Sequence, residues 1–161
     1  MTQARFNIPV YVGLVTVDRI LDLRHRVLLA GLPVESARFE ADLLPQTTHY
    51  GAFLLNGKGN PKGEPVCCAS FALKFYNKKP AWQLRGMATD ERYRGCNVGA
   101  QVLSKAEQEL CSNSRYAHIK IFWCNARSAA VNFYKKNGWQ VCSGVFDIPT
   151  AGPHHVMTKT S

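Results

Sequence analysis

Residues 92–100 read RYRGCNVGA, and this stretch decides how the rest of the chain is interpreted. It follows LRGMAT, which is typical of a strand, and leads into residues 98–110, where apolar side chains recur every four residues as on one helix face. The first amides of a helix have no acceptor within the helix and attract anions. Small residues let an anion approach the backbone, and arginine adds a charged, forked donor. The stretch therefore indicates either a diphosphate-binding turn or a tight turn whose glycines serve geometry alone.

Two familiar phosphate-binding motifs do not match this stretch. No G-K-[ST] follows the glycines, which excludes a P-loop. The dinucleotide fingerprint G-x-G-x-x-G also fails, because Gly95 and Gly99 are four residues apart with Asn97 between them.

The composition of the whole chain is that of an ordinary globular protein. Its 161 residues predict one domain over 1–161, and 46% hydrophobic with 19% charged residues exclude a disordered or fibrous chain. Apolar runs stay well below the length of about 20 residues that a membrane-spanning helix requires. The N-terminal residues 1–19 have neither a basic leader nor a small-residue cleavage site, so we interpret them as part of a strand rather than a signal peptide.

The six cysteines favour a reduced, cytoplasmic protein. They form no C-x-x-C pair, and neither cysteines nor histidines have the spacing of a zinc site, so no metal is expected. Four of them fall in apolar, strand-like runs and are expected in the core: Cys67, Cys68, Cys124 and Cys142.

The formal net charge of +9 is unevenly distributed. The segment 110–146 contains no Asp or Glu, which suggests an anionic partner, either nucleic acid or a phosphorylated small molecule. A solvated basic face without function is the alternative. The basic residues of this segment are Arg115, Lys120, Arg127, Lys135 and Lys136.

Hydrophobic periodicity and turn residues predict the order β-α-α-β-β-β-α-β-α-β-β, an α/β domain with a mixed sheet. Pro9 marks the first strand as an edge strand, and the Gly- and Pro-rich residues 56–65 predict a hairpin. The predicted strands cover 5–16, 49–56, 65–76, 81–89, 118–124, 139–146 and 154–159. The predicted helices cover 18–30, 35–44, 98–110 and 126–138.

The stretch 92–100 resembles the acetyl-coenzyme A loop of the GNAT superfamily of N-acetyltransferases, [QR]-x-x-G-x-[GA]. Arg94 takes the first position and Gly99 the last, while Asn97 stands where the family has its middle glycine. Asparagine tolerates left-handed backbone better than most residues, so the departure is mild.

Further segments resemble the same family. LRGMATDERYRG is similar to the strand that leads into the loop, NFYKKNGW to the recurrent F-Y-x-K-x-G-F, and SGVFDIPTAGPHHVMTK to the closing strand pair. The matches cover residues 83–160. The resemblance implies a mixed, mostly antiparallel sheet of six to seven strands, with the fourth and fifth strands splayed apart, and about four helices.

The resemblance implies that acetyl-CoA lies between the splayed strands as a cosubstrate. Backbone groups of Met87, Ala88 and Thr89 would pair with its pantetheine arm, and the Met87 amide would donate to the thioester carbonyl as an oxyanion-hole group does. The diphosphate would be held by Arg94, Gly95, Cys96, Asn97, Val98, Gly99 and Ala100.

Tyr134 is the residue that the resemblance assigns to proton donation. A phenol within reach of the thioester sulfur can protonate the departing thiolate. A helix residue that merely packs against the sheet is the alternative, and Phe133 beside it is expected in the core, near the cofactor. The family often has an Asn seven residues before this tyrosine; here that residue is Arg127, and Asn125 either replaces the contact with the cofactor arm or the contact is absent.

The base that deprotonates the incoming amine stays open at this point. A water chain is one alternative, and His154 and His155 cannot both line one pocket, because neighbouring strand residues point to opposite faces. The candidate side chains are His25, Glu40, His49, His154 and His155.

The leading functional hypothesis is an N-acetyltransferase that transfers acetyl directly, in a ternary complex, to a primary amine of a small molecule or a protein. A cysteine relay is disfavoured, because Cys96 would face the diphosphate. A nucleic-acid-binding module is a weaker alternative, since the aromatic residues Tyr93, Phe122 and Trp123 look buried. A non-catalytic acyl-CoA sensor and a homodimer are left open.

Overall fold

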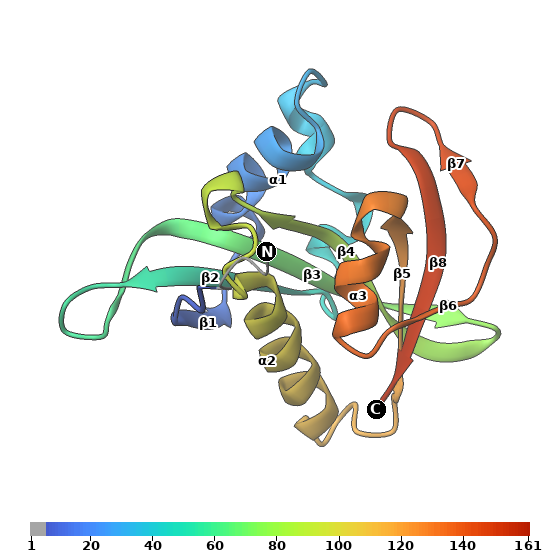
Figure 1. The fold of residues 1–161 in the computed structure, drawn as a ribbon. Coiled ribbons are helices and arrows are strands. Elements are labelled where there is room, and N and C mark those ends of the chain that lie inside the picture. Colours follow the sequence, from blue (N-terminus) through green and yellow to red (C-terminus); the bar gives the residue numbers. More distant parts are fainter. Residues whose placement is uncertain (1–5) are drawn as a thin grey trace.

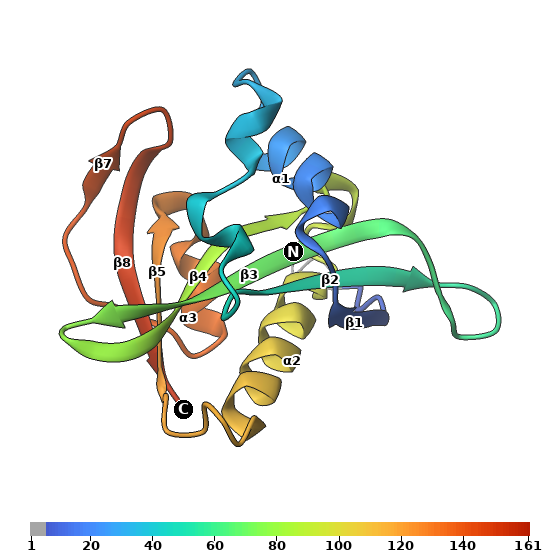
Figure 2. The same cartoon turned by 180° about the vertical axis from the view of Figure 1, so that it is seen from behind.

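The computed structural model describes residues 6–161, which form one eight-stranded sheet with three α-helices (Figures 1 and 2). The helices are α1 (Leu21–Leu28), α2 (Val98–Ser112) and α3 (Val131–Lys136). The strands are β1 (Val10–Leu14), β2 (Thr48–Leu55), β3 (Pro61–Tyr76), β4 (Lys79–Thr89), β5 (Ile121–Arg127), β6 (Gln140–Val141), β7 (Phe146–Ile148) and β8 (Gly152–Thr160).

The sheet has the order β1-β2-β3-β4-β5-β8-β6, and β7 also pairs with β8. Its pairs in the described part are antiparallel except β4 with β5, which run parallel because α2 carries the chain from one to the other. These two strands pair only at Trp82 with Phe122 and at Gln83 with Trp123. Beyond these positions they separate toward Thr89 and Arg127, so the expected splay is present; we call this opening the β4–β5 wedge.

The helices cover both faces of the sheet. Helices α2 and α3 lie on the face seen in Figure 1, and α1 lies on the opposite face, seen in Figure 2; we call the latter the α1 face. The predicted apolar stripe of α2 is buried against the larger core cluster. That stripe consists of Val98, Val102, Ala106 and Leu110. A smaller cluster beneath α1 includes Ile20, Leu23, Cys68 and Ala88.

The predicted helix over 35–44 is wrong. The chain instead forms two 3-10 turns, Val34–Ala37 and Glu40–Leu43, separated by extended backbone at Arg38 and Phe39. The cause is a tertiary contact. The buried Arg24 side chain donates a hydrogen bond to the carbonyl oxygen of Ala37 at 2.8 Å, and a continuous helix would need this oxygen for its own backbone bonds. The predicted helix 18–30 is likewise shorter, a 3-10 turn Val17–Arg19 followed by α1.

The C-terminal boundaries also differ from the prediction. Strand β5 continues to Arg127, where a helix was expected, and α3 follows a 3-10 turn, Ser128–Ala130. The predicted strand 139–146 is broken into β6 and β7, and Cys142 between them is exposed rather than in the core. This break raises the strand number to eight. The first strand is limited to β1, and Arg5 lies outside the described residues.

Candidate active site

The β4–β5 wedge contains a backbone irregularity at Gly86 and Met87. Arg85 and Ala88 on β4 pair with Ser70 and Cys68 on β3, so β4 has one residue more than its partner between these pairs. This is a β-bulge, which leaves backbone groups of the bulged strand without ladder partners. Gly86 has a φ of +60°, and a Cβ there would lie 2.5 Å from Nε of Arg24, so the bulge requires glycine.

Four predicted site residues from three elements meet at the wedge. The Tyr134 hydroxyl of α3 donates to the sulfur of Met87 on β4 at 3.7 Å. A Cβ on Gly99, at the start of α2, would lie 3.1 Å from the Phe133 ring and 3.3 Å from the Met87 methyl group. A side chain at position 99 would have to displace Phe133 and Met87 slightly, so glycine there allows β4, α2 and α3 to approach one another around the Met87 side chain.

The Tyr134 side chain is buried, with 7% of its surface exposed. Its ring packs against those of Phe133 and Trp139, with centroid distances of 5.1 and 5.5 Å. Burial raises the pKa of the Tyr134 phenol far above its ordinary value, and the neighbouring Cys124 and Cys67 raise it further. The hydroxyl therefore keeps its proton throughout the neutral range and can act as a donor.

The loop before α2 has the geometry of an anion site. Gly95 and Asn97 both have left-handed backbone, with φ of +75° and +63°, so asparagine does occupy a left-handed position as expected. Asn97 precedes α2 without capping it through its side chain. The backbone amides of Val98, Gly99 and Ala100 have no hydrogen-bond acceptor within residues 6–161. The loop thus presents free donors at a helix N-terminus, as a diphosphate requires.

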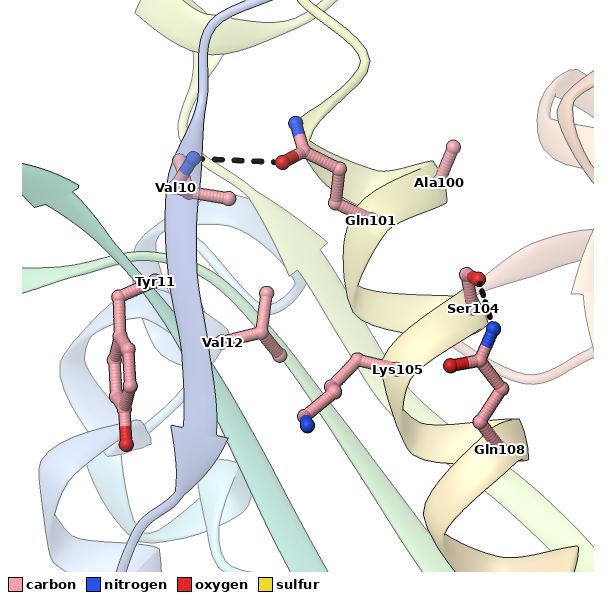
Figure 3. Close-up of a pocket in the computed structure, with 8 residues that line it drawn as sticks. All are labelled: Val10, Tyr11, Val12, Ala100, Gln101, Ser104, Lys105 and Gln108. Carbon is pink, nitrogen blue, oxygen red and sulfur yellow. Dashed lines mark hydrogen bonds between the residues drawn. The ribbon is translucent and has the colours of Figure 1, made fainter.

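The N-terminal segment supports this loop through hydrogen bonds. The amide of Ile8 donates to the carbonyl of Cys96 at 3.1 Å, and the Gln101 side-chain amide donates to Ile8 at 2.8 Å. A shallow groove of about 500 Å³ lies between β1 and α2. Figure 3 shows the residues that line it and the hydrogen bond from the Val10 amide to the Gln101 side chain. Within this groove Val10 bonds to Gln101 and Ser104 to Gln108, and neither Met87 nor Tyr134 lines it. It is a packing seam that supports the loop.

Comparisons with known proteins agree with this geometry. A family model described as "Acetyltransferase (GNAT) domain" matches residues 51–141, and an uncharacterized N-acetyltransferase, YitI, of Bacillus subtilis strain 168 is 32% identical over 149 residues, covering 91% of this chain and 93% of YitI. The chain belongs to the GNAT acetyltransferase family. The members of this family transfer an acetyl group from acetyl-CoA to an amine.

Solved structures share the fold of this GNAT chain. ElaA of Escherichia coli matches with a TM-score of 0.71 and 19% identity, covering 92% of this chain and 99% of ElaA. An aminoglycoside 6'-N-acetyltransferase complexed with coenzyme A matches with a TM-score of 0.70 and 16% identity, covering 93% of this chain and 96% of that one. The mixed, mostly antiparallel sheet expected from the sequence is therefore confirmed as the GNAT fold.

Asp90 connects the loop of the GNAT domain to α1. Its carboxylate is 2% exposed and accepts hydrogen bonds from the backbone amide of Arg92 at 3.0 Å and from the Arg26 side chain at 3.0 Å. The Arg92 side chain also donates to it, at 2.9 Å. These bonds, above all those from Arg92, hold the Asp90 pKa well below its usual range.

Arg94 makes only a loose contact with Glu91 and is half exposed, free to reach a ligand.

We predict that Asp90→Asn lowers the free energy of unfolding by about 1.5–3 kcal/mol at pH 7, the range for hydrogen bonds to charged groups. The folded-state pKa lies below the ordinary value of about 3.9, so the carboxylate stabilises the fold fully above that pH and loses this effect as the pH falls. The melting temperatures of variant and wild type should therefore begin to converge as the pH falls below about 4 and continue to approach each other at lower pH. Asp22→Asn is the matched control, because Asp22 pairs with the same Arg26 but is exposed. A difference independent of pH would contradict the assignment.

Asn125 and Arg127 lie apart from the residues that meet at the β4–β5 wedge. Cys124 and Ala126 are buried toward Tyr134, and Asn125 between them is exposed on the α1 face. The Arg127 side chain donates to the carbonyl of Leu28, the last residue of α1, at 2.8 Å. A contact of Asn125 with the cofactor arm therefore stays a prediction, and its side chain lies on the face opposite Tyr134.

Two of the histidines considered as bases are engaged elsewhere. His49 is 7% exposed, and its ring nitrogens contact the Ser70 hydroxyl at 2.6 Å and the Asp42 carbonyl at 3.0 Å. His25 contacts the carbonyl of Leu32 at 2.8 Å through Nε2. Both histidines thus have structural partners.

The remaining candidates are distributed over different surfaces. His154 pairs with Arg127 and His155 with Ala126, so the two rings face opposite sides of the sheet. His154 is buried, and its Nδ1 lies 2.7 Å from the carbonyl of Gly152. Glu40 is exposed in its 3-10 turn. The His154 side chain lies on the α1 face, as does that of its partner Arg127. The 3-10 turn that contains Glu40 packs on the same face, where its Asp42 binds Arg24.

Sequence reasoning missed a buried ionic network on the α1 face. Arg24 is fully buried and binds both carboxylate oxygens of Asp42, at 2.7 and 3.0 Å, and the Ser70 hydroxyl at 2.6 Å. Its guanidinium carbon lies 4.3 Å from the centre of the Phe39 ring. A signal was available, because Leu23, Arg24 and Val27 share one face of α1, in line with Ile20 just before it, and a charge on a buried face needs a partner.

Proposed function

We propose that this GNAT acetyltransferase passes the acetyl group of acetyl-CoA directly to a primary amine of a small molecule or protein, with Met87 and Tyr134 at the reacting centre. The observation that carries the proposal is the contact between the Tyr134 hydroxyl and Met87 at 3.7 Å, in the β4–β5 wedge and beside the free amides of α2. Acetyl-CoA-dependent transfer is the activity of the family; the roles of individual residues are our inference.

The residues of the wedge fit an extended thioester. The diphosphate would accept from the amides of Val98, Gly99 and Ala100, with Arg94 adding charge. The pantetheine arm would follow the backbone of Met87, Ala88 and Thr89. The bulge at Gly86 supports a free Met87 amide, which would donate to the thioester oxygen as negative charge develops there.

Chemistry then requires two proton transfers. The amine attacks the carbonyl carbon, a C–N bond forms, and the C–S bond breaks. The Tyr134 hydroxyl gives its proton to the departing sulfur, and the amine loses a proton to water or to a base on the α1 face. The phenol is restored by a proton from solvent, so the products are an N-acetylated amine and coenzyme A.

Burial of the nearby thiols supports direct transfer over a cysteine relay. It raises the pKa of Cys67 to about 11 and that of Cys124 to about 12, so both stay protonated and are poor nucleophiles. Cys96 belongs to the diphosphate loop, and its sulfur lies 3.7 Å from the Arg94 carbonyl. We further propose that residues 1–161 act as one domain in the cytoplasm, where the six free cysteines stay reduced.

The proposal predicts that acetyl-CoA raises the melting temperature. At a concentration of 100 Kd, a ligand of the folded state contributes about 2.7 kcal/mol, which corresponds to about 5–10 °C for a domain of this size. Gly99→Val is the matched control, because its side chain would meet Phe133 and Met87 and should abolish the shift. The absence of a shift at millimolar acetyl-CoA in the wild type would contradict the proposal.

The same protein distinguishes the proposed transferase from two alternative functions, nucleic-acid binding and acyl-CoA sensing. Of the three aromatic residues expected to be buried, Phe122 is fully buried, whereas Tyr93 and Trp123 are half-buried. Trp123 also packs on the Tyr76 ring, which leaves less aromatic surface for nucleic acid than the sequence offers. Salt-dependent retention of DNA or RNA without an acetyl-CoA shift would favour that function. A shift without acetyl transfer across a broad amine panel would favour a sensor.

A further inference from the structure

We propose that the acceptor carries an anionic group, a carboxylate or a phosphate, beside its reactive amine, and that Arg85 binds this group. The inference rests on the proposed transferase function and specifies its acceptor class. It starts from the position of Arg85, two residues before Met87 on β4, or about 7 Å along the strand.

Arg85 lies on the side of the sheet from which the amine would approach. It pairs with Ser70 on β3, and the Ser70 side chain binds Arg24 on the α1 face. Directly paired residues of an antiparallel ladder share a face, so the Arg85 side chain also lies on the α1 face. Tyr134 lies on the opposite face with α3. A group held by Arg85 would therefore sit on the acceptor side of the thioester, close to the Met87 backbone.

The Arg85 guanidinium is supported by a fixed aromatic ring. Its central carbon lies 4.8 Å from the centre of the Phe39 ring. Phe39 is held by its amide, which donates to the Asp42 carboxylate at 2.7 Å, and by the buried Arg24. A guanidinium stacked on a ring keeps its N–H edges free for bidentate binding of a carboxylate or phosphate.

The charge of Arg85 is not neutralised within residues 6–161. Six other arginines of this part form ion pairs, whereas Arg85 pairs with no carboxylate and is exposed. Arg127 on β5 adds a second unpaired guanidinium on the α1 face, with one N–H donated to Leu28. Two unneutralised cations beside the wedge attract an anionic acceptor and repel a second cation near its amine.

The test compares matched acceptors at saturating acetyl-CoA. Amino acids are assayed beside their carboxamides, and O-phosphoethanolamine beside ethanolamine, so that the two arms separate carboxylate from phosphate. We expect wild-type kcat/KM to favour the anionic member of at least one pair by about tenfold or more. Arg85→Gln should remove this preference, mainly by raising the KM for the anionic acceptor. The kcat/KM for the neutral member of the pair and the KM for acetyl-CoA should stay unchanged. Arg85→Lys should restore part of it.

Arg115→Gln is the matched control. Arg115 also lies over an aromatic ring, that of Tyr116 at 5.4 Å, and has no carboxylate partner within residues 6–161, but it follows the C-terminal end of α2. We expect this variant to keep the wild-type preference. Equal rates for the two members of every pair in wild type, or an equal loss for both members in Arg85→Gln, would overturn the proposal.

A binding measurement keeps the inference separate from the proposed function. The anionic compounds are titrated calorimetrically into the protein saturated with coenzyme A. Binding that weakens in Arg85→Gln supports the anionic site even if no amine of the panel is acetylated, whereas no binding of any anionic compound overturns it. The acetyl-CoA melting shift tests the transferase function independently.

Discussion

Tyr134→Phe is expected to lower kcat by about 10²- to 10⁴-fold with little change in the KM for acetyl-CoA. The substitution removes one hydroxyl, the group 3.7 Å from the Met87 sulfur, and keeps the ring that packs on Phe133 and Trp139. The fold should therefore be retained. A loss of kcat and kcat/KM by the same factor would show that the hydroxyl acts in the transition state rather than in binding.

The pH profile adds a second readout for the same residue. Since burial raises the Tyr134 pKa far above its usual value, wild-type kcat should not fall between pH 8 and about 10 through loss of this proton. Tyr116→Phe is the matched control, because Tyr116 packs edge-on against Trp82 at 5.3 Å outside the wedge. An unchanged kcat in Tyr134→Phe would exclude the tyrosine as the acid.

Those parts of the fold that depend on local pattern were predictable from the sequence. The apolar stripe of α2, the strand before it and the loop between them follow from periodicity and from glycine placement. The left-handed Asn97 follows from the tolerance of asparagine for that conformation. Such signals are carried by neighbours in the chain, so no knowledge of distant contacts was required.

Other parts depend on contacts between distant segments. The residues 35–44 do not form one helix, because Arg24 from α1 binds Ala37 and Asp42 and thereby fixes two separate turns. Residues 139–146 look like one strand, yet β8 pairs with two short pieces of it. Intrinsic propensity is a weak guide where tertiary bonds compete for the same backbone groups.

The acceptor side of the site was the least predictable part. Arg85, Phe39 and Arg127 come from β4, a 3-10 boundary and β5, and no spacing in the sequence connects them. Two available signals were not used: Gly86 within a strand pattern is typical of a bulge, and Arg24 on an apolar helix face indicates a buried partner. The identity of these partners required the folded chain.

Asp42→Ala is expected to cost about 3–5 kcal/mol in the free energy of unfolding. It would leave the fully buried Arg24 guanidinium without its counter-ion and the Phe39 amide without its acceptor. Urea denaturation measures the loss. Asp18→Ala is the matched control, because the ion pair of Asp18 with Arg38 is short, at 2.6 Å, but exposed, and should contribute less than about 1 kcal/mol.

The double variant Arg24→Met/Asp42→Leu distinguishes charge from packing. Removing both buried charges abolishes the uncompensated cation, so most of the stability lost in Asp42→Ala should return. Phe39 would still lack the bonds that fix it beneath Arg85, so the acceptor KM should rise while the acetyl-CoA melting shift persists. If Asp42→Ala costs no more than Asp18→Ala, the Arg24 network does not hold the α1 face together, and the support that it provides to Arg85 falls with it.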